Sequence, residues 1–421
     1  MRKLFYIEDS IQNRVSYYHL LCFLVALPYD RFYSTVILVS FLMHTAIHLQ
    51  KEYFKKINTE TLLLQSVFFV TVAAASYAVS FGAAMNTVTK QLAVFLIPLA
   101  FNLNSLDLLK YRSRLLKGFT IGCTLTVVWL YIDAFRTMRY EKIPLKALFS
   151  QAFVNHNFSQ PIDMHATYLS MLLAIALIFL VKRIMLGTQK KNHIVLSICS
   201  LVLAAGLIQL SSKSVLIALL LIFNIAFPWY LPGKKMRYRF LLVSVAMSSL
   251  LLLVILNIDV FRERYLVDFK KDLFKNTGIL KDNWRRDRWI ASVDLIKKAP
   301  IIGQGSGSEI PLLKEIYFER KMYNAYLKSL NAHNQYLSFI INSGIIGLII
   351  YLGTLSWGFW KAIKRKDLLL LSFMLLVTIV SFSEDLLDVN KGIFFYAFFF
   401  SFFVLSKRKK ADSMTDTGNQ L

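Results

Sequence analysis

The stretch LNAHNQYLSFIINSGIIGLIIYL, residues 330–352, decides the fold class of this chain. It begins at the end of a segment rich in charged residues and continues as an apolar run without any charged residue. A run of this length can cross the hydrocarbon core of a bilayer as an α-helix. His333 and Asn334 lie at its polar end. A histidine at the boundary between water and membrane can donate, accept or titrate.

Apolar runs near membrane-spanning length recur along the whole chain of 421 residues, 56% of which are hydrophobic. One large soluble core does not need such runs, so the pattern predicts an all-α polytopic membrane protein with about twelve transmembrane helices. The predicted spans are residues 15–30, 32–49, 61–80, 89–104, 118–136, 164–181, 194–210, 214–231, 240–257, 335–356, 367–382 and 391–406. The first is short enough to be re-entrant. A second run follows it at once, which favours a retained span over a cleaved signal.

The net charge of +24 would indicate a nucleic-acid partner in a soluble protein, but here the basic residues flank membrane spans. When the N-terminus is placed inside, 26 of the 49 Lys and Arg residues fall in the inner segments and eight in the short outer segments. Short cytoplasmic segments of membrane proteins are enriched in Lys and Arg. The asymmetry therefore predicts that both termini are cytoplasmic, and no nucleic-acid partner is expected.

The remaining 15 basic residues lie in segment 258–334, the longest outer segment. Loops longer than about 60 residues cross the membrane largely regardless of charge, so this segment is compatible with the same orientation. The chain then divides into transmembrane helices over 1–257, an outer loop over 258–334, transmembrane helices over 335–406 and a disordered tail over 407–421. Only this loop has room for a functional unit, although outer segment 137–163 can form a short lid.

The loop contains two predicted helices. KDNWRRDRWIASVDLIKKAP, residues 281–300, has the pattern of a helix that Asp282 or Asn283 caps and that Pro300 ends. We expect it to lie in the outer membrane interface, with its arginines directed at lipid phosphates. Its predicted apolar face contains Trp289, Val293 and Ile296.

The second predicted helix, PLLKEIYFERKMYNAYLKSL, covers residues 311–330 and begins at Pro311. Its predicted apolar stripe consists of Leu312, Ile316, Tyr323 and Leu327. The sequence GQGSG at residues 303–307 joins the two helices. No strand precedes these glycines, so a flexible turn is favoured over a nucleotide site.

The arginines of the first loop helix, Arg285, Arg286 and Arg288, have two interpretations. Each can extend to lipid headgroups as an ordinary interfacial residue. Alternatively, their guanidinium groups can bind a diphosphate with paired hydrogen bonds. His333 is either a structural histidine or a base, and the arginine helix 48 residues upstream favours the second interpretation.

Other polar residues are predicted near the outer face. Lys213, in the short turn SSKS, is either a flanking residue or a cation for a phosphate. His165 opens a span, where a core hydrogen bond is its simplest role. Glu384, Asp385 and Asp388 form an acidic turn that is solvated, pairs with the arginines or, less readily, holds a metal.

No Walker loop, Gly-x-Ser-x-Gly elbow or His-Glu-x-x-His motif is present, so an activated substrate delivered within the membrane is the expected energy source.

Several motifs together resemble the shared region of O-antigen ligases and O-antigen polymerases. The pattern is R-x-x-x-W, then P-x-x-G-x-G, then, after an insert, H-N-x-Y-L and G-x-x-G. Its residues here are Arg285, Trp289, Pro300, Gly303, Gly305, His333, Asn334, Tyr336, Leu337, Gly344 and Gly347. The plan of twelve spans with one large outer loop also resembles that family.

The resemblance implies a metal-independent glycosyltransferase without a cofactor in the bacterial inner membrane. It would take a glycan from a polyprenyl diphosphate carrier at the periplasmic face, and in ligases the acceptor is lipid A–core. His333 and Arg285 fall on the family's catalytic positions. Lys213 replaces a family arginine and Glu384 fits a family glutamate. The expected substrate-binding residues are Lys213, Arg288, Arg286, Asn334, Glu384 and His165.

The leading interpretation is an O-antigen ligase acting on a lipid-linked glycan and surrounded by membrane lipids. An O-antigen polymerase and a protein O-oligosaccharyltransferase share the donor and differ in the acceptor. A lipid or polysaccharide transporter is the non-enzymatic alternative. That alternative predicts symmetric halves and broken midplane helices, whereas only Pro98 and Pro228 interrupt the predicted spans.

Overall fold

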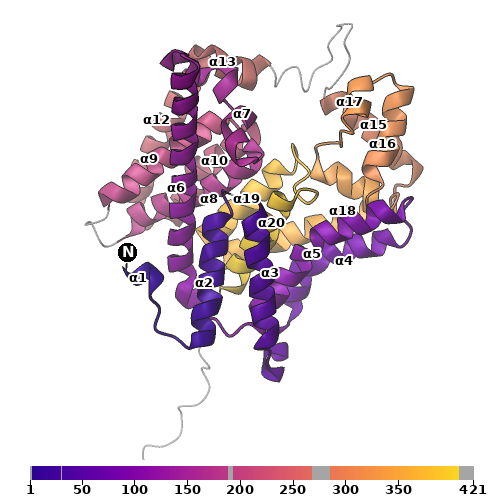
Figure 1. Cartoon of the computed structure of the whole chain (residues 1–421), viewed down its shortest axis with the longest axis horizontal. Helices are drawn as coiled ribbons and strands as arrows, with labels where there is room; N and C mark the ends of the chain where they lie inside the picture. Colours follow the sequence, from indigo (N-terminus) through magenta and orange to yellow (C-terminus); the bar gives the residue numbers. More distant parts are fainter. Residues whose placement is uncertain (1, 30, 188–192, 268–284, 407–421) are drawn as a thin grey trace, which may run out of the picture.

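The computed structural model describes residues 2–29, 31–187, 193–267 and 285–406. Within these residues every regular element is a helix and there is no strand (Figure 1). The predicted all-α fold is therefore confirmed. The predicted tail at 407–421 and the predicted helix caps Asp282 and Asn283 lie outside the described residues.

Each predicted span coincides with a helix or a continuous run of helical turns. The long helices are α5 (Phe81–Leu103), α6 (Leu108–Tyr140), α8 (Ala166–Leu186), α9 (His193–Leu210), α12 (Lys234–Asn257) and α18 (Gln335–Lys364). The eighth predicted span is the run of α10 (Lys213–Leu221), the π-helical turn η6 (Ile222–Ala226) and α11 (Phe227–Tyr230). The shorter helices are α2 (Ile11–Ala26), α3 (Arg31–Ile47), α4 (Thr59–Ala75), α19 (Leu368–Val380) and α20 (Asn390–Leu405).

Seven of these helical segments in the described part of the chain are long and apolar enough to cross a membrane, namely the six long helices and Lys213–Tyr230. Four of the shorter helices, α3, α4, α19 and α20, are apolar but below that length. The structure is thus that of a helical membrane protein. The count of twelve crossings remains a prediction.

Helix α20 lies at the centre of the bundle. Every residue from Lys391 to Val404 is buried, and seven of them are Phe. A helix that is hydrophobic all round is stable only when other helices surround it. Ring contacts connect it to several neighbours, and their centroid distances include 5.0 Å for Phe398–Phe23, 5.5 Å for Phe398–Phe101 and 5.0 Å for Phe399–Phe119.

Polar contacts sort the connecting segments into two groups at the ends of the helices. Segments predicted as inner are joined by ion pairs at 2.7 Å, Lys361–Glu60 and Arg112–Asp367. Segments predicted as outer are joined by Lys391 Nζ, which donates to Leu27 O at 3.0 Å, and by Gln91 Nε2, which donates to Leu387 O at 3.1 Å. This grouping agrees with the predicted alternation of the spans, and the side facing the cytoplasm remains a prediction.

Three short helices of the segment predicted as the long outer loop form a small unit with its own core. Figure 1 shows α15 (Arg285–Lys298), α16 (Glu309–Glu319) and α17 (Tyr323–Leu327) together at one edge of the molecule, near the start of α18. Their core contains Ala291, Leu295, Leu313, Ile316, Tyr317, Met322, Ala325 and Ile341. The predicted loop helices are therefore present, although they associate with one another.

The predicted apolar face of α15 is only partly buried in this core. The buried residues of α15 are Arg288, Ala291, Ser292 and Leu295, and Ile296 packs against the core, whereas Val293 is 42% exposed. The predicted position of this helix in the membrane interface remains a prediction. The second predicted helix is interrupted. At Lys321 the backbone has φ 58°, and Tyr323 and Leu327 of the predicted stripe are exposed.

The glycine segment after α15 packs against a kink in α18. Gly344 has φ 64° and ψ −167° inside this helix, a conformation that only glycine adopts readily. Gln304 N donates to Ile341 O at 2.7 Å and Ile345 N donates to Pro300 O at 2.9 Å. A Cβ on Gly303 would lie 2.5 Å from Gly344 N. The segment is a turn, as predicted, but its backbone is fixed by packing and is not a flexible linker.

Candidate functional site

His333 lies directly before α18 in a backbone conformation that is costly for a residue other than glycine. Its φ is 47°, in the left-handed region. Asn334 is the N-cap of α18, and its Oδ1 accepts hydrogen bonds from Tyr336 N at 3.0 Å and Leu337 N at 3.3 Å. The cap satisfies the first amides of the helix and fixes the position of the histidine. Asn334 is thus a structural cap, and its contact with substrate remains a prediction.

The His333 ring contacts a buried carboxylate. Its Nδ1 lies 3.4 Å from Glu384 Oε2, and the histidine side chain is 30% exposed whereas that of Glu384 is 9% exposed. Arg285 Nη2 lies 3.9 Å from Glu384 Oε1, and Thr167 Oγ1 donates to the same oxygen at 3.3 Å. Three predicted site residues therefore meet, although they come from α15, the start of α18 and the turn before α20.

Glu384 is ionised despite its burial. Burial alone would raise the pKa of this carboxyl, but the hydrogen bond from His333 and the charged neighbours of Glu384, among them Arg285, lower it to about 2. A carboxylate at Nδ1 favours the tautomer in which Nδ1 carries the hydrogen. Nε2 of His333 is then the atom that can accept a proton.

Two further histidines border this cluster. His165 caps α8, and its Nδ1 accepts a hydrogen bond from Thr167 N at 3.3 Å. Its ring centroid lies 4.2 Å from that of His156, which the sequence did not single out. Burial lowers the pKa of His165. Burial and the positive charge of Arg264 lower the pKa of His156 to about 4. Both rings are therefore neutral hydrogen-bonding groups near neutral pH.

The two residues before the histidine are held by side chains of the loop helices. Arg288 Nη1 donates to Asn331 O at 3.2 Å and Trp289 Nε1 donates to Ala332 O at 3.0 Å. Glu309 Oε1 accepts from Ala332 N at 2.9 Å. Arg288 is 5% exposed, so the structure places it under the backbone that precedes the histidine. Its predicted contact with substrate remains a prediction.

Another guanidinium group, which the sequence did not indicate, lies near the turn that contains Lys213. Arg264 Nε donates to Ser211 O at 2.9 Å, and Lys213 is the half-buried first residue of α10. Arg264 and His156 both line a cavity of about 330 Å³. Arg264 stands in FRERY, which has no motif, and only the fold brings it to the site. Arg286 is half-buried on α15.

The acidic turn before α20 is not a solvated turn. Glu384 and Asp385 are 7% and 2% exposed, and Asp388 Oδ1 pairs with Lys90 Nζ at 3.2 Å. Burial and the neighbouring carboxylates of Glu309, Asp388 and Glu384 raise the pKa of Asp385 well above its usual range. The contact of Glu384 with Arg285 agrees with the predicted ion-pair role. Within the described ranges no group of three His, Cys, Asp or Glu side chains is arranged for a metal, and metal independence remains a prediction.

The geometry can perform two chemical tasks. A histidine oriented by a carboxylate can accept a proton from a hydroxyl group. Arg285 on α15, Lys213 at the start of α10 and Arg264 can stabilise an anion at the same end of the bundle.

The comparisons with known proteins cover the central part of the chain. A family model described as O-antigen ligase matches residues 198–352. A search of curated proteins gives no significant match. The matched range includes Lys213, Arg264, Arg285 and His333, and it ends before Glu384.

Proposed function

We propose that this chain, which the match over residues 198–352 assigns to the O-antigen ligase and polymerase family, is a ligase-like glycosyltransferase. It moves a glycan from a polyprenyl diphosphate carrier to lipid A–core at the periplasmic face of the bacterial inner membrane. The observation that carries this proposal is the contact of both His333 and Arg285 with the carboxylate of Glu384. One carboxylate thereby aligns a base and a cation at the end of the bundle where the predicted outer turns meet.

The leaving group accounts for the cations. When the sugar leaves its carrier, the diphosphate takes the electron pair of the broken carbon–oxygen bond and becomes more negative. Arg285, Lys213 and Arg264 are the residues that would stabilise this charge, with Arg286 nearby on α15. Arg285 and Arg264 can each bind two phosphate oxygens, whereas Lys213 supplies a point charge.

The base acts on the acceptor. The hydroxyl oxygen of the acceptor sugar attacks the anomeric carbon, and its proton passes to Nε2 of His333. Glu384 stays ionised and stabilises the resulting imidazolium, because its pKa is about 2. Direct displacement inverts the configuration at the anomeric carbon. No metal or cofactor takes part in the proposed step.

An apolar cavity supports a lipid-linked donor. It has a volume of about 310 Å³ and lies among α8, α9, α10 and α12. Leu216 and Leu219 of α10 line it, and the same helix begins at Lys213. A prenyl chain in this cavity would contact the helix that begins at Lys213, next to the Ser211 carbonyl that Arg264 binds. The diphosphate and the hydrocarbon of the donor would then contact the same helix.

Three alternatives remain as outcomes of the test. A polymerase and a protein O-oligosaccharyltransferase use the same donor with a different acceptor. A transporter has no need of a histidine oriented by a carboxylate, so this pair favours an enzyme. The lipopolysaccharide gel pattern of a deletion strain separates these functions. For a ligase we expect the lipopolysaccharide to lose all long glycan chains and to keep an intact core. A core that carries a single glycan repeat would indicate a polymerase. An unchanged pattern would contradict both the ligase and the polymerase.

A further inference from the structure

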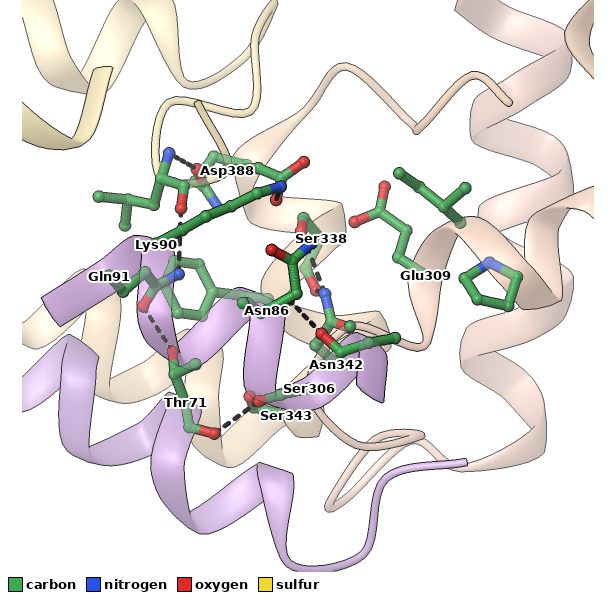
Figure 2. Close-up of a pocket in the computed structure, with 18 residues that line it drawn as sticks. Thr71, Asn86, Lys90, Gln91, Ser306, Glu309, Ser338, Asn342, Ser343 and Asp388 are labelled. Carbon is green, nitrogen blue, oxygen red and sulfur yellow. Dashed lines mark hydrogen bonds and ion pairs between the residues drawn. The ribbon is translucent and has the colours of Figure 1, made fainter. Parts of the chain in front are cut away.

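A polar cavity of about 270 Å³ lies beside the site, between α4 and α5 on one side and α16 and α18 on the other (Figure 2). Figure 2 shows Asn86, Ser338 and Asn342 close together, with Lys90 and Asp388 on one side and Glu309 on the other. Neither the sequence motifs nor the proposed transfer step uses this cavity.

Its walls are held in place by hydrogen bonds. Thr71 Oγ1 donates to Gln91 Oε1 at 2.7 Å, and Gln91 Nε2 donates to Leu387 O at 3.1 Å. Ser306 Oγ donates to Thr71 O at 2.6 Å. These contacts tie α4, α5, the glycine segment and the acidic turn together. The cavity is therefore formed before any ligand arrives, which reduces the entropic cost of binding.

Polar side chains from two helices line the cavity. Ser338 and Asn342 of α18 are joined by a hydrogen bond from Asn342 Nδ2 to Ser338 O at 2.9 Å. Asn86 and Thr87 of α5 also line the cavity, and the side chain of Asn86 is exposed. Amide and hydroxyl groups both donate and accept, as sugar hydroxyls do. Phe339 adds an aromatic ring to the wall for the apolar face of a sugar.

The charge of the cavity disfavours a diphosphate. Lys90 and Asp388 neutralise each other in an ion pair at 3.2 Å. Glu309 is the other acid in the wall, and burial raises its pKa to about 7. The described lining thus has no excess of cations, so it suits a neutral group with many hydroxyls.

The cavity is connected to the catalytic histidine by short contacts. Glu309, in its wall, accepts a hydrogen bond from Ala332 N, the residue before the histidine. Gln335, also in its wall, accepts from Leu387 N at 2.7 Å through Oε1. A sugar bound there would be next to the residues that position His333.

We propose that this cavity is a carbohydrate subsite, which binds one sugar residue of the glycan donor or of the acceptor through its hydroxyl groups. The identity of the sugar rests on the proposed function. The subsite adds to that function a place where the sugar binds, apart from the cations that hold the diphosphate.

The test uses the full-length protein in detergent and the double variant Asn86→Leu and Thr87→Val. This variant removes two polar groups of α5 with little change in volume. The control is Asn257→Leu, an exposed asparagine on α12 outside the cavity. We expect the double variant to raise KM for one substrate about tenfold, because the two lost hydrogen bonds together cost about 1.4 kcal/mol, and to leave kcat within about twofold. A higher KM for the lipid-linked donor would mean that the subsite binds a sugar of the donor. A higher KM for lipid A–core would mean that it binds a sugar of the acceptor.

Calorimetry measures binding at the subsite without the transfer reaction. The probes are core oligosaccharide freed of lipid A and the glycan repeat freed of its carrier. We expect one of them to bind the wild type and the Asn257→Leu control, and to bind the double variant about tenfold more weakly. Normal transfer with unchanged KM values and unchanged binding in a folded double variant would overturn the subsite and leave the proposed function intact. Cavity-dependent binding without any transfer would retain the subsite and overturn the function. Absence of both in the wild type would overturn both.

Discussion

At the scale of single residues, Arg285 and the proposed base both contact Glu384. Arg285→Ala should lower transfer about 100- to 1,000-fold, the effect of removing one group that stabilises a developing anion. Arg285→Lys should recover little, since a point charge replaces the planar guanidinium. The measurement is transfer by purified protein, and Arg262→Ala, which changes an exposed arginine of the same loop, is the control. Wild-type rates for Arg285→Lys would show that Arg285 only flanks the membrane.

His333 should control the rate. His333→Ala should lower kcat about 100- to 10,000-fold with little change in donor binding. Glu384 should remain its charged partner over the working range of pH. Its folded pKa of about 2 lies below the usual 4.5, so it stays ionised at pH 5, and its stabilising effect is lost only as the pH falls towards 2.

The control for this experiment is His48→Ala, which changes an exposed histidine at the opposite end of the helices. A near-normal rate for His333→Ala would refute the base mechanism. A wild-type enzyme that chelators inhibit would refute its metal independence.

Part of the site was predictable at this scale, and part was not. His333, Arg285 and Glu384 stand in or near motifs, and the structure brings them together. Thr167, His156 and Arg264 join them only through the fold, and a single sequence carries no signal for such contacts. The cap formed by Asn334 and the burial of Arg288 also depend on packing around α18.

At the scale of the elements, hydrophobic runs predicted the helices well because length and composition determine them. The packing faces of short helices were harder to predict. On α15 the buried positions include Arg288 and Ser292, which no hydrophobic pattern selects. The kink at Gly344 was also not predictable, since a glycine inside an apolar run is usually read as part of a straight helix.

This kink leads to a prediction about stability. Gly344→Ala should lower the free energy of unfolding by about 2 kcal/mol or more, because the residue has φ 64° and a Cβ would meet the Ile301 carbonyl. Gly353→Ala on the same helix is the matched control, since a Cβ there has no atom within 4 Å. It should be neutral or slightly stabilising. Thermal unfolding in detergent measures both, and equal melting temperatures would mean that the kink is not required.

At the scale of the whole molecule, the orientation is the central prediction. Alkaline phosphatase fused at about Thr277, outside the described residues, should be active, whereas a fusion after Lys364 should be silent. The reason is the excess of Lys and Arg in the segments predicted as inner, which ion pairs such as Lys361–Glu60 join together. Reversed activities would place the site on the cytoplasmic face and overturn the proposed donor.

The position of α20 has a consequence for biogenesis. The helices that surround it, among them α2, α5 and α6, all precede it in the chain, so the ribosome makes them first. Until α20 enters the membrane, Phe23, Phe101 and Phe119 on these helices lack their ring partners. The turn that carries Glu384 is made at the same late stage. We therefore expect the centre of the bundle and the proposed catalytic pair to be completed at the same step of synthesis.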